Sequence, residues 1–262
     1  MSRRIAVFDL DGTLLHGDTD EYWLQFLIDE GVVDHGAVEA QNCDIQARYA
    51  QGCASAEEFC FFYVGLLRGR TRRELEPLYT QFMREIILPN LPRAALALVA
   101  DESQRAELLV MSTATSSFLS APIGRHLGFE HIVATEPEVD DQGRFTGGCI
   151  GLPNMRAHKV ARLDDWLAAR GRRIADFHES WFYTDSRNDL PLLEHVTHPI
   201  AVDPDPELAA RAQRDGWPVL RIHPPATPHA VRPATPGAAV GATSGSETNA
   251  IASTTARAAV AD

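Results

Sequence analysis

Cysteine is scarce in this sequence, and its spacing is not that of a ligand set. No two cysteines are separated as C-x-x-C, the spacing of many zinc and redox sites. The four present are Cys43, Cys53, Cys60 and Cys149. They are typical of reduced thiols in a cytosolic protein. We expect a cytoplasmic location, since Asp9 also interrupts the short apolar run that follows Arg3 and Arg4 and so excludes a signal peptide.

Positive charge and long apolar runs are also in short supply. Lys and Arg number 24 against 36 Asp and Glu, which gives a formal net charge of −12. Without a cluster of basic residues, this balance opposes binding to nucleic acid. No apolar stretch approaches the ~20 residues of a membrane span. An acidic protein that acts on an anionic substrate needs a metal ion or local cations.

What the chain has is enough apolar sequence for a core. Its 262 residues are 45% hydrophobic, which suits one domain or a core domain with a smaller insert. Residues 4–10 form an apolar run that predicts a short buried strand. Residues 19–88 read only as helices, with capping-box patterns at Ser55 with Glu58 and at Thr71 with Glu74.

Beyond residue 92, predicted helices and strands alternate. This pattern predicts an α/β fold, a Rossmann-like parallel sheet with helices on both faces. A small helical cap domain follows the first strand. The expected divisions are 1–16 with 89–223 for the core and 17–88 for the cap. Residues 224–262 are rich in Ala, Thr, Pro, Ser and Gly, which predicts a disordered tail.

Several predicted strands end in residues that can do chemistry. The first ends at Asp9 and Asp11, a second ends at Ser112 and Thr113, and a third ends at Asp185. Ligands of open α/β sheets bind at the carboxyl ends of the strands, so these residues are expected in one crevice. Asp189 follows the third strand, and Lys159 opens the helix before it.

Carboxylates gathered in one crevice repel one another unless a cation lies among them. Hard oxygen ligands with open positions suit Mg²⁺, which also takes phosphate oxygens. A carboxylate can act as a nucleophile and form an aspartyl-phosphate. A hydroxyl and a lysine can hold the phosphate while its charge is neutralised. The residue types therefore point to phosphoryl transfer.

Four stretches resemble the motifs of the haloacid-dehalogenase superfamily, in the superfamily's order. They are "FDLDGTLL", "VMSTAT", Lys159 and "YTDSRNDLPLL". The helical segment after the first stretch resembles that superfamily's cap. The likeness is strongest to the phosphoserine-phosphatase-like subclass, including its bacterial histidinol-phosphatase branch, and it spans about residues 4–222.

The resemblance implies a role for each matching residue. Asp9 is the expected nucleophile and a Mg²⁺ ligand, and Asp11 is the expected general acid and base, with its carbonyl on the metal. Asp185 is the expected further metal ligand. The expected phosphate-binding residues are Ser112, Thr113 and Lys159, and Asp189 is expected to support them. Plainer roles stay open, such as a helix cap for Ser112, a turn for Asp185 and a surface position for Lys159.

Two positions depart from the subclass. Thr184 stands where the family often has glycine, which costs little at a strand end. Tyr63 falls where phosphoserine phosphatases carry an arginine for the substrate carboxylate, and a phenol cannot replace a guanidinium there. Arg48 is a possible substitute, on the preceding predicted helix.

The expected substrate is therefore a small phosphate monoester without a carboxylate. Histidinol phosphate fits, and its cationic amine would suit the acidic residues near the cap hinge, unless these only begin a helix. Those residues are Asp18, Asp20 and Glu21. Phosphoserine or another small monoester is the alternative, and a catalytically silent binding module is a second. The expected partner is the small substrate, with no nucleic acid or membrane and a monomeric or homodimeric state.

Overall fold

The computed structural model describes residues 3–51 and 53–223, except for the side chains of 37, 49 and 50. The predicted tail, 224–262, lies outside the described residues. The described chain contains a six-stranded sheet in the order β3-β2-β1-β6-β7-β8, with every neighbouring pair parallel. Its strands are β1 (Arg4–Phe8), β2 (Leu108–Ser116), β3 (His131–Thr135), β6 (Glu179–Thr184), β7 (His198–Val202) and β8 (Val219–Leu220).

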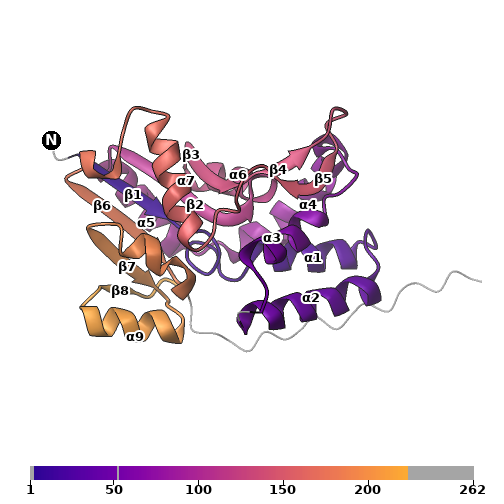
Figure 1. The fold of residues 1–262 in the computed structure, drawn as a ribbon, viewed down its shortest axis with the longest axis horizontal. Coiled ribbons are helices and arrows are strands. Elements are labelled where there is room, and N and C mark those ends of the chain that lie inside the picture. The colour runs from indigo at the N-terminus through magenta and orange to yellow at the C-terminus, as the bar shows by residue number, and fades with distance from the viewer. Residues whose placement is uncertain (1–2, 52, 224–262) are drawn as a thin grey trace, which may run out of the picture. The chain divides into compact units, whose positions relative to one another are not determined.

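Helices follow the strands of this sheet and cover both of its faces (Figure 1). They are α5 (Arg93–Arg105), α6 (Ser117–Leu127), α7 (Ala157–Ala168), α8 (Leu190–Leu193) and α9 (Pro206–Asp215), with 3₁₀ turns at Ile174–Asp176 and Arg187–Asp189. An antiparallel hairpin, β4 (Pro137–Val139) with β5 (Phe145–Cys149), stands apart from the main sheet. The α/β class predicted from the sequence is confirmed.

Strand β1 is buried on both faces, which explains its unbroken apolar sequence. Ile5 and Val7 point into one core with α7, α8 and α9, while Ala6 and Phe8 point into a second with α5 and α6. Alternate side chains of a strand face opposite ways, so one short strand joins both layers. This central position fixes the tip of β1, where Asp9 lies.

Four helices lie between β1 and α5, as expected, and in Figure 1 they gather away from β6 and β7. They are α1 (Thr19–Asp29), α2 (His35–Ala50), α3 (Ala56–Gly65) and α4 (Arg72–Phe82), followed by a π-turn at Met83–Ile87 and a 3₁₀ turn at Leu88–Asn90. Both predicted capping boxes are formed, with Ser55 and Glu58 at α3 and Thr71 and Glu74 at α4. No helix among the described residues is both long and apolar enough to cross a membrane.

Two predicted elements are shorter in the structure than in the sequence analysis. The apolar run near the end of the described chain forms only the two-residue strand β8, and the segment after Asp185 forms a 3₁₀ turn and the four-residue helix α8. Pro191 lies at the start of α8, where proline is tolerated, and α8 ends within one turn.

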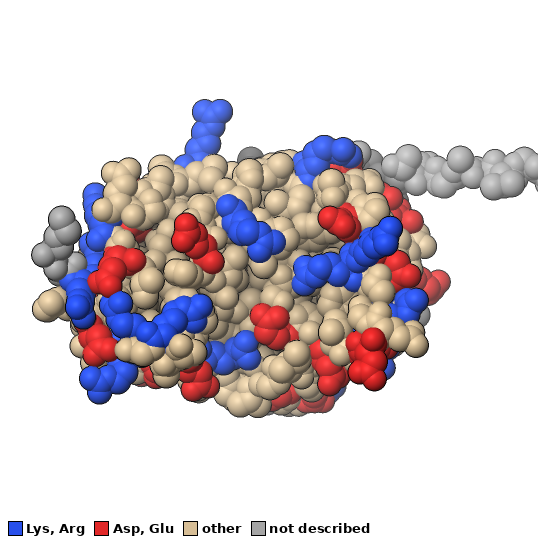
Figure 2. All heavy atoms as spheres, turned by 90° about the horizontal axis from the view of Figure 1, so that it is seen from above, with Lys and Arg blue, Asp and Glu red and all other residues tan. Residues whose placement is uncertain are grey.

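Surface charge on one face of the molecule is mixed. Figure 2 shows acidic and basic side chains interspersed there, without a broad region of positive charge on that face.

Trp23 is the residue that ties the inserted helices to the sheet. It is 1% exposed and its ring contacts Tyr79 and Phe82 of α4 and Phe118 of α6. Trp23→Ala should lower the free energy of unfolding by about 3–5 kcal/mol, because it leaves a cavity at this junction. Phe61→Ala is the control, since Phe61 is 42% exposed and its removal should cost little. Chemical denaturation measures both, and equal effects would contradict this account of the junction.

Candidate active site

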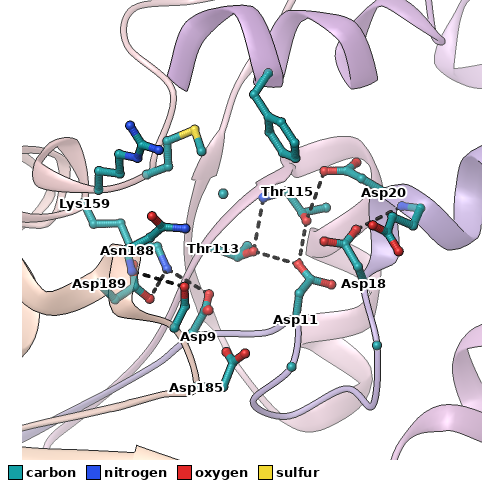
Figure 3. A pocket seen from close by; sticks show the side chains of 18 residues that line it. Asp9, Asp11, Asp18, Asp20, Thr113, Thr115, Lys159, Asp185, Asn188 and Asp189 are labelled. Atoms are coloured by element: carbon teal, nitrogen blue, oxygen red, sulfur yellow. Dashed lines mark hydrogen bonds and ion pairs between the residues drawn. The ribbon is translucent and has the colours of Figure 1, made fainter. Parts of the chain in front are cut away.

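A cavity of about 430 Å³ opens at the carboxyl ends of β1, β2 and β6. Its walls carry most of the charged residues that the sequence singles out, together with residues of α1, α3 and the segment before α7 (Figure 3). The residues that line it include Asp9, Asp11, Asp18, Asp20, Glu21, Thr113, Lys159, Asp185 and Asp189. The strand-tip rule therefore brings together residues that lie up to 180 positions apart in the sequence.

Lys159 joins two carboxylates at the bottom of this cavity. Its ammonium donates hydrogen bonds to Asp9 Oδ1 at 2.9 Å and to Asp189 Oδ2 at 2.7 Å. All three residues are buried, and Thr184 Oγ1 also donates to Asp189 Oδ2 at 2.7 Å. Burial alone lowers the pKa of Lys159, but the carboxylates of Asp189 and Asp9 outweigh it and raise that pKa above its usual value. The lysine is therefore held as a cation.

The pKa of Asp9 is strongly perturbed by its surroundings. Burial raises its pKa well above the usual value, Lys159 opposes this, and the neighbouring acids Asp189, Asp185 and Asp11 raise it further. Its backbone N–H donates to Tyr183 O at 2.9 Å, which fixes the residue to β6. A cation beside Asp9 would relieve the repulsion that raises its pKa.

Asp11 points away from Asp9 and toward the start of α1 (Figure 3). Its Oδ1 accepts from the backbone N–H of Thr19 at 2.7 Å and from the Thr19 hydroxyl. Its Oδ2 accepts from Thr115 Oγ1 at 2.7 Å and from Thr113 Oγ1 at 3.4 Å. Hydroxyl groups thus orient this carboxyl group from two sides, while Lys159 holds Asp9. The two acids of the first motif have different surroundings.

Gly12 and Asp185 form a close approach that only glycine permits. Gly12 has φ +69°, and a Cβ there would lie 2.2 Å from Asp185 Oδ2. Thr13 fixes the carboxylate from the other side, since its hydroxyl donates to Asp185 Oδ1 at 2.9 Å and accepts from the Asp185 N–H at 2.9 Å. Burial raises the pKa of Asp185 to about 7, with Thr13 opposing the shift.

These residues fit a divalent cation of the magnesium type. Within the described residues, no group of three or more His, Cys, Asp or Glu side chains converges as a ligand set. Two carboxylates, Asp9 and Asp185, line the same part of the cavity, and the backbone of Asp11 lies between Asp9 and Gly12. Mg²⁺ commonly takes one or two carboxylates and fills its other positions with water and substrate phosphate.

Asp18 and Asp20 lie across the cavity from Lys159 (Figure 3), and Glu21 also lines the cavity; these three residues form an acidic trio. Asp18 caps α1 by accepting from the backbone N–H of Glu21 at 2.9 Å, so the predicted helix role and a cavity position coexist. Burial raises the pKa of Asp18 well above its usual value and the pKa of Asp20 to about 8, with Asp11 as the next cause for both. Glu21 Oε1 accepts from Gln46 Nε2 at 2.6 Å.

Three predicted site residues are not brought to the cavity. Ser112 is fully buried and accepts from Asn154 Nδ2 at 3.1 Å, while its neighbour Thr113 lines the cavity instead. Pairing of β2 with β3 is irregular from Ser112 onward, so strict alternation does not set which of these side chains faces the cavity. Tyr63 is buried and bonded to Asn42.

Arg48 is the third of these residues. It pairs with Glu58 at 2.8 Å and with Asp44 at 3.5 Å on the surface of the helical segment. Neither Arg48 nor Tyr63 is therefore among the residues that line the cavity.

The structure also adds lining residues that the sequence analysis did not select. They include Gly12, Thr115, Phe59, Met155, Arg156 and Asn188. One compositional signal was available for a residue that was selected: Lys159 is the only lysine in the sequence, where every other basic residue of the Lys and Arg class is arginine.

Comparison with known proteins decides the family. A model of the haloacid dehalogenase-like hydrolase family matches residues 6–194. The chain belongs to this family. A histidinol-phosphatase of Neisseria meningitidis serogroup C is 37% identical over 220 residues, which cover 84% of this chain and 99% of that protein.

Solved structures agree on the fold. A Bordetella pertussis Tohama I protein of unknown function is 43% identical, with a TM-score of 0.81 over 85% of this chain and 100% of that one. A phospho-aspartyl intermediate analogue of phosphoserine phosphatase is 17% identical, with a TM-score of 0.60 over 85% of this chain and 95% of that one. The resemblance seen in the motifs is confirmed by the family match and by the histidinol-phosphatase relative, and the phosphoserine phosphatase structure has the same fold.

Asp20 should make the metal-free protein lose stability as pH rises. An unfolded aspartate titrates at about 3.9, and the folded pKa is about 8. Between these values the folded chain holds a proton that the unfolded chain has lost, so stability falls through this window. Asp20→Asn removes this titration.

Thermal melting in the presence of a chelator measures the effect. The melting temperature of Asp20→Asn, relative to wild type, should rise from about pH 4 to about pH 8 and then level off. Asp29→Asn, at the exposed end of the same helix, is the control for the loss of one charge. An Asp20→Asn difference that does not change with pH would contradict the raised pKa.

Proposed function

We propose that this protein is a Mg²⁺-dependent phosphomonoesterase that works through an aspartyl-phosphate on Asp9. The class, a phosphatase of the haloacid dehalogenase-like hydrolase family, follows from the family match and from the 37% identical relative. The observation that carries the mechanism is the different support of two neighbouring acids. Lys159 holds Asp9, while hydroxyl groups hold Asp11.

In the proposed first step, an oxygen of Asp9 attacks phosphorus and the bond from phosphorus to the leaving alcohol breaks. Lys159 orients the Asp9 carboxylate and favours its ionised form against the effect of burial, and Asp189 holds Lys159 in place. Because the ammonium is buried between the two carboxylates, its position is fixed before substrate arrives. The hydroxyl of Thr113, which lines the cavity, is the proposed phosphate donor in place of Ser112.

Asp11 is the proposed proton carrier. Its carboxyl group gives a proton to the leaving alcohol, then takes a proton from the water that hydrolyses the aspartyl-phosphate. Thr19 and Thr115 hold the carboxyl group at the boundary between the sheet and α1, between the proposed nucleophile and the acidic trio. In this position, it lies where the leaving group would extend from the phosphate.

A Mg²⁺ ion would be held by the Asp9 and Asp185 carboxylates and the Asp11 carbonyl. When bound, the ion would neutralise negative charge on the phosphate. Gly12 keeps Asp185 in place, because the absence of a Cβ lets the carboxylate lie against the backbone.

For the substrate, we propose a phosphate ester that also carries a cationic amine, with histidinol phosphate as the leading candidate. The acidic trio of Asp18, Asp20 and Glu21 lines the cavity, with Asp18 and Asp20 on the side opposite Lys159. Desolvated neighbouring acids raise one another's pKa, and a bound ammonium would reverse this shift. The 37% identical relative is named a histidinol-phosphatase, which supports this choice.

Phosphoserine is less well supported as the substrate. Its carboxylate needs a cation on the cap side of the cavity, where the acidic trio lies. Tyr63 and Arg48, the two candidate positions for that role, bond to other residues of the helical segment. A catalytically silent binding module is also less well supported, because Asp9, Asp11, Lys159 and Asp185 all line the cavity. The domain division, oligomeric state and cytoplasmic location stay predictions.

Substitution of the two acids tests the division of roles. Asp9→Asn should abolish turnover of p-nitrophenyl phosphate and the acid-stable phosphoenzyme, because it removes the nucleophile. Asp11→Asn should slow turnover by about 10²–10⁴-fold. It should leave Mg²⁺ affinity close to wild type in calorimetry, since the proposed contact is a backbone carbonyl. Unchanged turnover in Asp11→Asn would contradict the proposed proton transfer by Asp11.

A substrate panel tests the acidic wall. Histidinol phosphate should have a kcat/KM at least about tenfold above that of phosphoserine. Glu21→Gln should raise KM for histidinol phosphate by about tenfold, the loss of roughly 1.4 kcal/mol, and leave KM for p-nitrophenyl phosphate within about twofold. Asp29→Asn is the matched control on α1. Equal efficiency on histidinol phosphate and phosphoserine would refute the assignment of the amine.

A further inference from the structure

The cavity is crowded with negative charge, and its cations come from one short segment. Among the described residues that line it, seven are acidic and two are basic. The two basic residues are Arg156 and Lys159, three positions apart at the start of α7. Lys159 is committed to Asp9 and Asp189. A doubly charged phosphate group entering this cavity needs more positive charge than Lys159 supplies.

The backbone fixes Arg156 in an unusual conformation. Its φ is +51° and its ψ is −134°, and Arg156 and Asp203 are the two non-glycine residues with positive φ in the described chain. Side chains other than glycine rarely adopt this geometry, and such positions gather at functional sites. The backbone conformation at this position therefore makes arginine unfavourable for the stability of the fold.

The segment before Arg156 is bound firmly to the sheet. Asn154 Nδ2 donates to Thr113 O at 2.9 Å, to Val133 O at 2.9 Å and to Ser112 Oγ at 3.1 Å. Its backbone N–H donates to Thr135 Oγ1 at 3.0 Å. Ser112 therefore acts as a support for Asn154. These bonds hold the base of Arg156 beside the tips of β2 and β3.

We propose that Arg156 is a substrate-binding residue whose guanidinium contacts the phosphoryl group of the ester, an inference that rests on the proposed function. The planar guanidinium donates paired hydrogen bonds to phosphate oxygens, a geometry that ammonium lacks. In this proposal Lys159 bonds to the nucleophile Asp9, and Arg156 bonds to the phosphoryl oxygens. The strained backbone places the side chain on the cavity wall that carries Lys159.

A competing role would be contact with the helical segment. Glu57 lies in the first turn of α3, and Arg156 and His158 contribute to the lowering of its pKa, after hydrogen bonds from its own backbone and Ser55. If Arg156 acted through Glu57, removing either partner would have the same effect. Variants of Arg156 and of Glu57 therefore distinguish a phosphate-binding role of Arg156 from a role in contact with the helical segment.

The test compares Arg156→Gly, Arg156→Lys, Glu57→Gln and Arg170→Ala with wild type. Glycine is relaxed at positive φ, so Arg156→Gly should melt at or above the wild-type temperature. It should nevertheless raise KM for p-nitrophenyl phosphate, and the calorimetric Kd for inorganic phosphate, by at least about tenfold. For Arg156→Lys, both constants should lie between those of wild type and Arg156→Gly, because lysine keeps the positive charge and loses the paired hydrogen-bond geometry. Arg170→Ala should leave both constants at the wild-type values, because Arg170 is exposed and lies just beyond the end of α7.

Several results would overturn the proposal. Phosphate affinity within about twofold of wild type in both Arg156 variants would do so. A rise in KM and Kd for Glu57→Gln equal to that for Arg156→Gly would also overturn it. So would a loss of affinity in the Arg156 variants that is confined to carboxylate-bearing substrates such as phosphoserine. If wild type hydrolyses no phosphate monoester, the proposed function fails, and the phosphate titration still decides whether Arg156 binds phosphate. If Arg156→Gly does not fold, Arg156→Lys decides the matter.

Discussion

The rest of the site depends on the ion triad of Asp9, Lys159 and Asp189. Two carboxylates this deeply buried would repel each other and lose hydration, and one ammonium between them compensates both. The triad also joins the tip of β1, the start of α7 and the turn after β6. The single lysine of a chain that otherwise uses arginine occupies this position, where one compact ammonium bonds to both carboxylates.

The triad can form because the sheet brings distant strand ends together. Ile5 and Val7 face one core and Ala6 and Phe8 face the other, so β1 cannot shift by one residue without turning both layers outward. This constraint sets the direction of Asp9 and starts the loop in which Gly12 meets Asp185. Core packing therefore determines the site's geometry before any ligand binds.

Sequence patterns could predict the fold class and the acids of the site, since strand tips of a parallel sheet share an edge and four motifs kept their order. They could not predict which hydroxyl of Ser112 and Thr113 faces the cavity. Pairing of β2 with β3 is irregular between Ser112 and Ser116, and Thr113, Ala114 and Thr115 all line the cavity, so simple alternation fails there. Arg156 was missed because its signal is a backbone angle, which composition and periodicity do not encode.

The charges of the cavity are ordered as well as numerous. Its basic residues belong to the segment from Arg156 to Lys159, and its acidic trio belongs to the start of α1 on the opposite wall. A molecule with a phosphate at one end and an ammonium at the other can satisfy both walls in one orientation, whereas its reversed placement meets like charge at both ends. That orientation places the phosphate beside Asp9. The same arrangement that selects a dipolar substrate therefore also aligns its phosphorus with the proposed nucleophile.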